Sequence, residues 1–344
     1  MDYITYEKGR QEVIVPVEEL LDDGKFNWRE KREKAVFLAD LYEKAGYPDY
    51  GVRALNCATF LQFGLYSSGQ RRLQAANFCQ LRLCPMCIAR RARRNALQLS
   101  RVLNMAQEEH DCRYLFLTLT IRNVEGPELS AALTELSAAW QRFLDQRQIR
   151  RTIKGWFRAI EITRKNKGYH PHIHAILAVD ADYFSRSSRQ SGKYLNQSEL
   201  IDRWQKALRV DYKPSVRIQV ARGKKAEDGT AIACAGGQAA LEAAKYSVKD
   251  GDYIDPELPE KVAVDVLRTY TEALRRRRLT AFGGILKDAA RALDADDLDG
   301  GDLVKVDDET IRSDILEMVE TYNWRLGAGD YVLSSREPPA PVQE

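Results

Sequence analysis

Residues 156–179 carry the pattern that most constrains how this chain can fold. Two apolar runs, WFRAIEIT and HPHIHAILAV, are separated by RKNKGY, a short turn with two lysines and a glycine. Runs of this kind joined by a short turn are typical of an antiparallel hairpin. Further strand-like segments are 114–121 (YLFLTLTI) and 216–221 (VRIQVA).

Amphipathic helices are predicted between these strands. They are expected over residues 88–109, from Pro127, from an N-cap at Ser198 to Leu208, and after Pro259. Strands interspersed with helices, including at least one hairpin, predict an α+β fold with a mainly antiparallel sheet flanked by helices.

Three of the four histidines of the chain lie at alternate positions of the second run. His170, His172 and His174 should therefore share one face of a strand. Neutral imidazole is a common ligand of transition metals. On the other strand of the hairpin, Glu161 stands between two isoleucines, where a carboxylate is costly to bury without a partner.

If the hairpin pairs as expected, Glu161 reaches the face that holds His172 and His174. Two imidazoles and one carboxylate leave open positions on a divalent ion, as a catalytic metal requires. The alternative is that the histidines are structural and Glu161 is a surface residue on an edge strand. The residues do not choose between Mg²⁺ and Mn²⁺.

The cysteines suggest a second metal site. Three of them lie within nine residues: Cys79, Cys84 and Cys87. The segment CPMC has the form of half of a structural zinc site. Cys57 is the preferred fourth ligand, and Cys112 or His110 are the substitutes. Cys234, in an alanine-rich stretch, is interpreted as a small buried residue.

The N-terminal sequence is mixed and acidic, unlike a secretory signal, and no apolar run has transmembrane length. We therefore expect a cytosolic setting, in which cysteines more often bind metal or stay reduced than form disulfides.

A predicted helix over LEAAKYSVKD, residues 241–250, carries a possible nucleophile. Glu242 and Tyr246 are four residues apart and share one helix face, and Lys245 and Lys249 share an adjoining one. A tyrosine beside lysines could attack a phosphorus atom, because the lysines favour phenolate and hold a phosphate. The carboxylate could act as a general base. The alternative is a packing tyrosine with a solvated hydroxyl.

Charge is distributed unevenly, although the net charge is only +3. Residues 71–101 contain eight arginines and no acid, whereas residues 288–320 contain twelve acids and three basic residues. The basic segment indicates contact with phosphates. The candidates for DNA binding are Arg82, Arg90, Arg91, Arg94 and Lys245. The acidic segment could compete with DNA for this basic surface or bind a partner.

The order of these motifs resembles a known family. FLTLT (116–120), the EIT strand, HPHIHAIL and EAAKYSVK follow one another as in the rolling-circle replication initiators of small bacterial plasmids. These proteins belong to the HUH endonucleases, which are named for two histidines around a hydrophobic residue, here Ile173. FCQLRLCPMCIARR, ALRRRRLTAFGG and NWRLGAGDYVL also resemble segments of these initiators. The resemblance covers roughly residues 55–335.

The resemblance implies a specific chemistry. His172, His174 and Glu161 would hold a catalytic Mg²⁺ or Mn²⁺, while Tyr246 would nick one DNA strand, leaving a 5′-phosphotyrosine and a 3′-hydroxyl primer. Glu242 would activate the water that ends replication. A single tyrosine in this helix departs from the two-tyrosine members and argues against tyrosine shuttling. Single-stranded or hairpin origin DNA would be the substrate, with a host polymerase and helicase as partners.

The resemblance also implies a central sheet of about five antiparallel strands. We expect a helical lead-in (1–50), a zinc-binding Cys/Arg-rich segment (51–110), an endonuclease core (111–255) and a helical C-terminal region with an acidic segment and frayed tail (256–344). Two alternatives stay open: a relaxase or transposase of the same superfamily, and a non-catalytic zinc-bearing DNA-binding protein.

Overall fold

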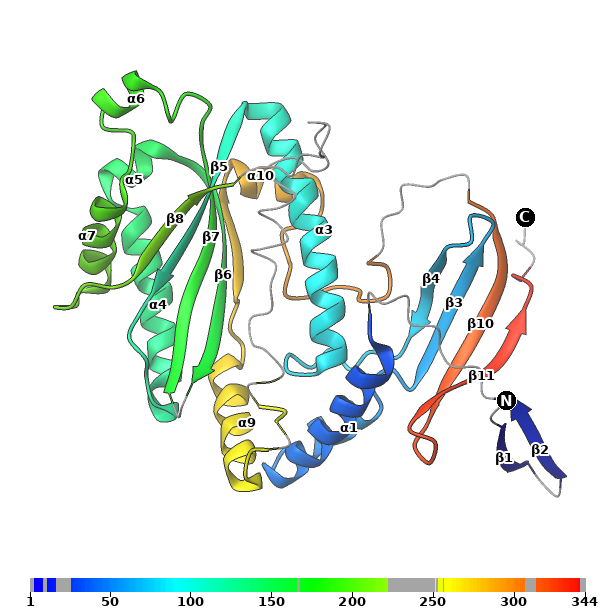
Figure 1. The fold of residues 1–344 in the computed structure, drawn as a ribbon. Helices are drawn as coiled ribbons and strands as arrows, with labels where there is room; N and C mark the ends of the chain where they lie inside the picture. Colours follow the sequence, from blue (N-terminus) through cyan, green and yellow to red (C-terminus); the bar gives the residue numbers. More distant parts are fainter. Residues whose placement is uncertain are drawn as a thin grey trace. The chain divides into compact units, whose positions relative to one another are not determined.

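The computed structural model describes residues 3–8, 11–16, 26–165, 168–221, 251, 253–255, 257–306 and 314–340. The chain divides into two compact units. Residues 1–90 and 302–344 make up the first unit, and residues 91–301 make up the second. Figure 1 shows the elements of both units.

A five-stranded antiparallel sheet forms the centre of the second unit, in the order β8-β5-β7-β6-β9. Its strands are β5 (Cys112–Thr120), β6 (Ile153–Lys165), β7 (Gly168–Asp180), β8 (Val216–Val220) and β9 (Thr280–Gly284). The predicted hairpin is confirmed as β6 and β7, with Glu161 directly opposite His172. The expected α+β fold with an antiparallel sheet of about five strands is also confirmed.

Helices cover both faces of this sheet (Figure 1). The helices between residues 85 and 292 are α3 (Pro85–His110), α4 (Leu129–Leu144), α5 (Arg147–Thr152), α6 (Arg186–Gln190), α7 (Gln197–Leu208), α9 (Glu260–Leu274) and α10 (Ile285–Ala292), with a 3-10 turn at Gly126–Glu128. On one face, Phe157 of β6 and Ile176 of β7 join Leu103 of α3 and Leu286 of α10 in one buried cluster. Because β7 is covered on both faces, its sequence is almost continuously apolar after His174.

Two predicted helix starts can be compared with the structure. The helix expected from Pro127 begins with the 3-10 turn, and its predicted apolar positions, among them Leu133 and Trp140, are buried. The N-cap of α7 is Asn196 rather than the expected Ser198. Asn196 accepts from the backbone N–H of Glu199, whose side chain accepts from the backbone N–H of Asn196.

The first unit contains a four-stranded antiparallel sheet in the order β11-β10-β3-β4. Its strands are β3 (Phe60–Tyr66), β4 (Arg71–Ala76), β10 (Leu316–Arg325) and β11 (Asp330–Glu337). Helices α1 (Trp28–Lys44) and α2 (Pro48–Leu55) precede this sheet, and β1 (Tyr3–Lys8) pairs with β2 (Gln11–Pro16).

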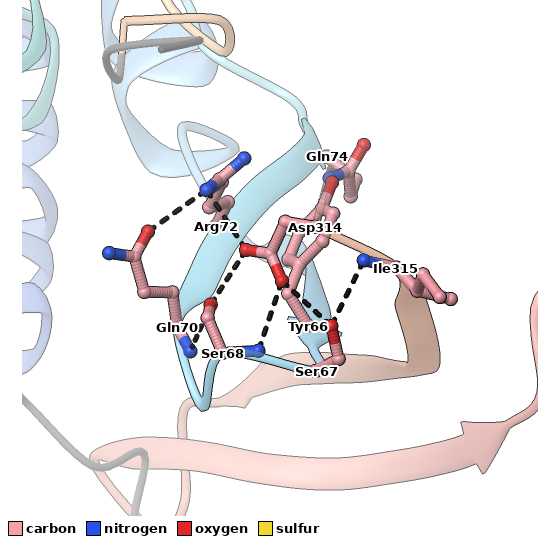
Figure 2. Close-up of polar contacts among 8 residues, drawn as sticks. All are labelled: Tyr66, Ser67, Ser68, Gln70, Arg72, Gln74, Asp314 and Ile315. Atoms are coloured by element: carbon pink, nitrogen blue, oxygen red, sulfur yellow. Dashed lines mark hydrogen bonds and ion pairs between the residues drawn. The ribbon is translucent and has the colours of Figure 1, made fainter. Parts of the chain in front are cut away.

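Both ends of the chain therefore contain strands, where a helical lead-in and a helical C-terminal region were expected. In β10, buried Glu320, Tyr322 and Trp324 alternate with partly exposed residues, which is the period of a strand rather than of a helix. Asp314, an acidic residue just before β10, also has a structural role (Figure 2). Asp314 accepts hydrogen bonds from both hydroxyls of Ser67 and Ser68 and pairs with Arg72, which ties the β3–β4 turn to β10.

None of the helices in the described parts of the chain is long and apolar enough to cross a membrane.

Candidate metal centres

Three potential ligand atoms converge on one face of the β6–β7 hairpin. The Nε2 atom of His174 lies 2.8 Å from Oε2 of Glu161, and Nε2 of His172 lies 3.2 Å from the same oxygen. Glu161 and His172 are each only 8% exposed, and His174 is half-buried. The register explains the convergence, because Glu161 pairs with His172 while His174 is two residues farther along the same face.

The Nδ1 atoms of His172 and His174 form hydrogen bonds with other groups. Nδ1 of His172 lies 3.0 Å from the backbone carbonyl of His170, and Nδ1 of His174 lies 3.2 Å from the Thr118 hydroxyl. A carbonyl oxygen can only accept, so Nδ1 of His172 carries the proton in this contact. A neutral His172 then turns the Nε2 lone pair toward the Glu161 carboxylate.

Electron pairs that face one another in this way require a cation, either a proton on the imidazole or a metal ion between the groups. Burial alone would raise the pKa of the Glu161 carboxyl, but hydrogen bonds with His172 and His174, and the positive charge of these imidazoles when they are protonated, hold that pKa well below its usual range. The group is therefore an anion beside two nitrogen ligands. These residues fit a divalent metal ion, with His170 supplying its carbonyl as a ring-orienting group.

We call Glu161, His172 and His174 the metal triad. The residues predicted to supply and assist the nucleophile are not placed relative to this triad. Tyr246, Glu242, Lys245 and Lys249 all lie outside the described residues, as does Cys234. Their assignments therefore stay predictions.

A second group of potential ligands lies in the first unit. The sulfur atoms of Cys57, Cys79, Cys84 and Cys87 all lie within 4.8 Å of one another. Cys57 precedes β3, Cys79 follows β4, and the other two stand at the start of α3. Cys57 and Cys79 lie on either side of the β3–β4 hairpin. Pairing of β3 with β4 therefore brings both cysteines together, near the N-terminus of α3.

The sulfur–sulfur distances fit a tetrahedral metal ion. Cys84 lies 3.5 Å from Cys57, and Cys87 lies 3.6 Å from both Cys57 and Cys79. Zinc–sulfur bonds of about 2.3 Å in tetrahedral geometry put neighbouring sulfurs about 3.8 Å apart. A disulfide needs about 2.05 Å, so these thiols are not bridged. Burial raises the pKa of the Cys84 thiol well above its usual range, so a bound cation would be needed to keep it ionised.

The structure brings Cys57 to this cluster and places the two substitutes elsewhere. Cys112 is buried in the core of the second unit, with its sulfur 3.7 Å from the Ala106 carbonyl. The His110 side chain is exposed at the end of α3. A fourth ligand 22 residues before Cys79 could be found because NCATFLQFG predicts a strand, here β3.

Two of the arginines expected to contact DNA are buried inside the protein. Arg90 donates to the backbone carbonyls of Leu303 and Val304 at 2.9 and 2.6 Å. Arg94 donates to the carbonyl of Leu298 at 2.9 Å. They are 2% and 5% exposed, so these side chains hold the chain together rather than face a phosphate.

The other two are accessible. Arg82 and Arg91 are partly exposed and stay candidates for DNA contact. The absence of acids from this segment did not separate buried arginines from surface ones, because backbone carbonyls far along the chain can replace carboxylates as partners of a guanidinium.

A family model described as "Replication protein" matches residues 70–332 of the chain, a range that contains Glu161, His172 and His174 and three of the four clustered cysteines, but not Cys57. The chain belongs to this replication protein family. The resemblance to plasmid replication initiators is thus confirmed and is favoured over the relaxase or transposase alternative.

Curated members of the family are similar over most of their length. "Protein rep" of Bacillus amyloliquefaciens is 34% identical over 330 residues, covering 90% of this chain and 94% of that protein. "Protein rep" of a Bacillus species is 34% identical over 309 residues, covering 84% and 97%. "Protein rep" of Streptococcus pneumoniae is 32% identical over 294 residues, covering 82% and 84%. No solved structure matches the chain.

Proposed function

We propose that this replication protein nicks one DNA strand at a rolling-circle plasmid origin, with Tyr246 as the nucleophile. The observation that carries the proposal is the convergence of two imidazole nitrogens and one carboxylate oxygen on a sheet face in a chain of this family. The arrangement can hold a divalent ion while leaving positions for a phosphate.

The residues of the chain have separate tasks in this scheme. Glu161, His172 and His174 hold a Mg²⁺ or Mn²⁺ ion, which would polarise the scissile phosphate. The phenolate oxygen of Tyr246 attacks the phosphorus atom and the bond to the 3′-oxygen breaks, giving a 5′-phosphotyrosine, while the leaving 3′-oxygen takes a proton from water and becomes a 3′-hydroxyl.

Lys245 and Lys249 favour the phenolate and bind phosphate oxygens. The 3′-hydroxyl primes a host polymerase, and a host helicase would open the duplex ahead of it. The phosphotyrosine keeps the bond energy for strand transfer, or Glu242 deprotonates a water that hydrolyses it.

We also propose that Cys57, Cys79, Cys84 and Cys87 bind a structural Zn²⁺. Their separation, burial and thiol chemistry support zinc, since four sulfur ligands leave no open position for a substrate. Arg82 and Arg91 are the remaining candidates of the basic segment for phosphate contact.

The nicking proposal is tested by a covalent-adduct assay. The purified full-length protein is mixed with single-stranded hairpins from its plasmid's origin, with Mn²⁺ or with EDTA, and adducts are separated on a denaturing gel. We expect a Mn²⁺-dependent adduct from the wild type and none from Tyr246→Phe. Lys249→Gln should slow its formation.

Tight DNA binding without an adduct under any metal would instead support the non-catalytic zinc-bearing DNA-binding protein. An adduct that persists in Tyr246→Phe would refute Tyr246 as the nucleophile. Equal adduct formation in Glu161→Ala would refute the metal triad.

A further inference from the structure

The triad end of β5 is fixed by residues that come later in the chain. Thr120, the last residue of β5, lies directly opposite His172. Its carbonyl accepts from the Trp204 indole at 2.9 Å, and its N–H donates to the Ser215 carbonyl at 3.2 Å. The backbone of the chain beyond Thr120 is therefore held at the edge of the metal-binding face.

Tyr212 extends this arrangement by one more hydrogen bond. Its hydroxyl accepts from the backbone N–H of Arg122 at 3.2 Å, so a side chain continues the pattern where the β5–β8 ladder has ended. The Arg122 guanidinium lies over the Tyr212 ring, 3.8 Å from the ring centroid. Both contacts hold the pair in one orientation two residues from Thr120.

The outer member of this stack is available to a ligand. Arg122 is exposed and Tyr212 is half-buried, so the guanidinium covers the ring from the solvent side. Among the described residues, Arg122 has no carboxylate partner. A planar cation that is held over an aromatic ring, and is not neutralised, presents a flat surface on which a nucleobase can stack.

A second arginine lies across the same face. Thr118 of β5 pairs with His174 of β7 on one side and with Arg217 of β8 on the other. Directly opposite residues project to the same face, so Arg217 shares the face of the triad at about 10 Å, or two strand spacings. Arg217 is exposed, and within the described parts of the chain it has no carboxylate partner.

We propose that Arg122, Tyr212 and Arg217 form a nucleotide subsite for the single DNA strand beside the metal triad. Arg217 contacts a phosphate, and the Arg122–Tyr212 stack holds a base that flanks the scissile phosphate. The proposal rests on the proposed function only in naming DNA as the strand. Stacking tolerates every base, so this subsite positions the strand and does not read its sequence.

The chain contains a matched control for the stack. Arg189 lies over Tyr194 at 4.9 Å, and this pair belongs to the segment around α6 that follows the far end of β7. The Arg189–Tyr194 pair has the same chemistry as the Arg122–Tyr212 pair but is remote from Thr120 and His172 in the register. A generic surface effect should appear at both pairs, whereas a subsite should appear only at Tyr212.

The test measures binding to the full-length protein in EDTA by fluorescence anisotropy. One probe is a fluorescein-labelled oligothymidylate, and the other is an abasic oligonucleotide of equal length, which keeps the phosphates but lacks bases. We expect Tyr212→Ala and Arg122→Gln to weaken oligothymidylate binding about tenfold. Binding of the abasic probe should change less. Tyr194→Ala should leave both affinities unchanged.

Arg217→Gln should behave differently, because it removes a phosphate contact. It should weaken binding of both probes and lower the slope of log affinity against log salt by about 0.7. The Tyr212→Phe variant keeps the ring and should retain most of the affinity. If Tyr212→Ala fails to fold, the exposed Arg122→Gln replacement carries the test.

Equal losses on both probes for Tyr212→Ala and Arg122→Gln, or the same loss for Tyr194→Ala, would overturn the base-stacking role. If the wild type forms the covalent adduct and these variants bind oligothymidylate normally, the subsite is refuted while nicking stands. If the wild type forms no adduct but the variants lose only oligothymidylate binding, the subsite stands without nicking.

Discussion

Thr118→Val isolates the hydrogen bond that orients one proposed metal ligand. For Nε2 of His174 to bind a metal, Nδ1 must carry the proton and donate it to the Thr118 hydroxyl 3.2 Å away. Valine has nearly the same shape as threonine and suits a strand equally well, so the substitution removes the acceptor without removing the packing.

The magnitude follows from the single bond that is lost. A neutral hydrogen bond contributes about 0.5–1.5 kcal/mol net. The upper end of that range is about tenfold in a binding constant. Loss of a group that orients a metal-binding histidine typically weakens metal affinity about 10- to 100-fold. The two ranges meet near tenfold, the expected weakening of Mn²⁺ binding; stacking of the His174 ring on Phe116 at 5.6 Å limits further loss.

Mn²⁺ binding is measured by isothermal titration calorimetry on protein loaded with Zn²⁺ at the proposed cysteine site, and adduct formation is followed at limiting and saturating Mn²⁺. Thr118→Val should be slow at limiting Mn²⁺ and near normal at saturation. Thr120→Val is the matched control, because the Thr120 hydroxyl donates its hydrogen bond to the Ser215 carbonyl rather than pairing with an imidazole nitrogen. Equal Mn²⁺ affinities for Thr118→Val and the wild type, or equal losses in both variants, would refute this role of Thr118.

Three further predictions test other parts of the structure. Cys57→Ser should lower the zinc content from one ion per chain and broaden thermal unfolding, whereas Cys112→Ser should leave the zinc content unchanged. Atomic emission measures the zinc content, and calorimetry measures unfolding. Zinc retained by Cys57→Ser would contradict a four-cysteine site. Arg90→Met removes two hydrogen bonds from a charged donor, to the carbonyls of Leu303 and Val304, and should cost about 3 kcal/mol in urea unfolding. Arg91→Met changes a partly exposed side chain, so it should cost less than Arg90→Met but weaken DNA binding, and the reverse ranking would contradict the assignment. Burial and the nearby Glu320 raise the pKa of Tyr322 to about 12, partly offset by Arg71, so stability should fall as pH rises from 10 toward 12. This fall should be smaller in Tyr322→Phe, and equal pH slopes in urea unfolding would count against the buried phenol.

The hairpin and its ligands could be predicted because local sequence specifies them. A turn of few residues fixes which residues of β6 and β7 face one another, so Glu161 and the two histidines follow from alternation alone. Cys57 was preferred because it lies in the strand-like stretch NCATFLQFG, and the structure adds that β3 pairs with the nearby strand β4. Where a site lies within one supersecondary unit, spacing carries most of the information.

Partners from distant parts of the chain could not be predicted. Arg90 and Arg94 lie in a segment whose composition predicts phosphate binding. Their guanidinium groups instead donate hydrogen bonds to backbone carbonyls within residues 298–304. Tyr212 gave no signal, because its meaning comes from its contact with Arg122, 90 residues away. A helical C-terminal region was expected, whereas residues 316–325 form β10, whose partners β3 and β11 were not identified from the sequence.

The acidic segment is partly committed to structure, which bears on its proposed competition with DNA. Asp299 accepts from the backbone N–H of Leu279 and from Thr280. Asp297 and Asp302 accept from backbone N–H groups of their own turns. Deletion of residues 288–344 would also remove β10 and β11, so competition is better tested by neutralising exposed acids such as Asp294 and Asp296.

The order of strands in the first unit has a consequence for synthesis of the protein. Gln62 of β3 bonds Thr321 of β10, its neighbour in the sheet, 259 residues later. At about 5–20 residues per second, the ribosome leaves this edge of β3 without its partner for about 13–50 seconds. An unpaired edge can join other chains. A chain released before β10 is made would keep the metal triad but expose that edge, so such products should aggregate or be degraded before they reach plasmid DNA.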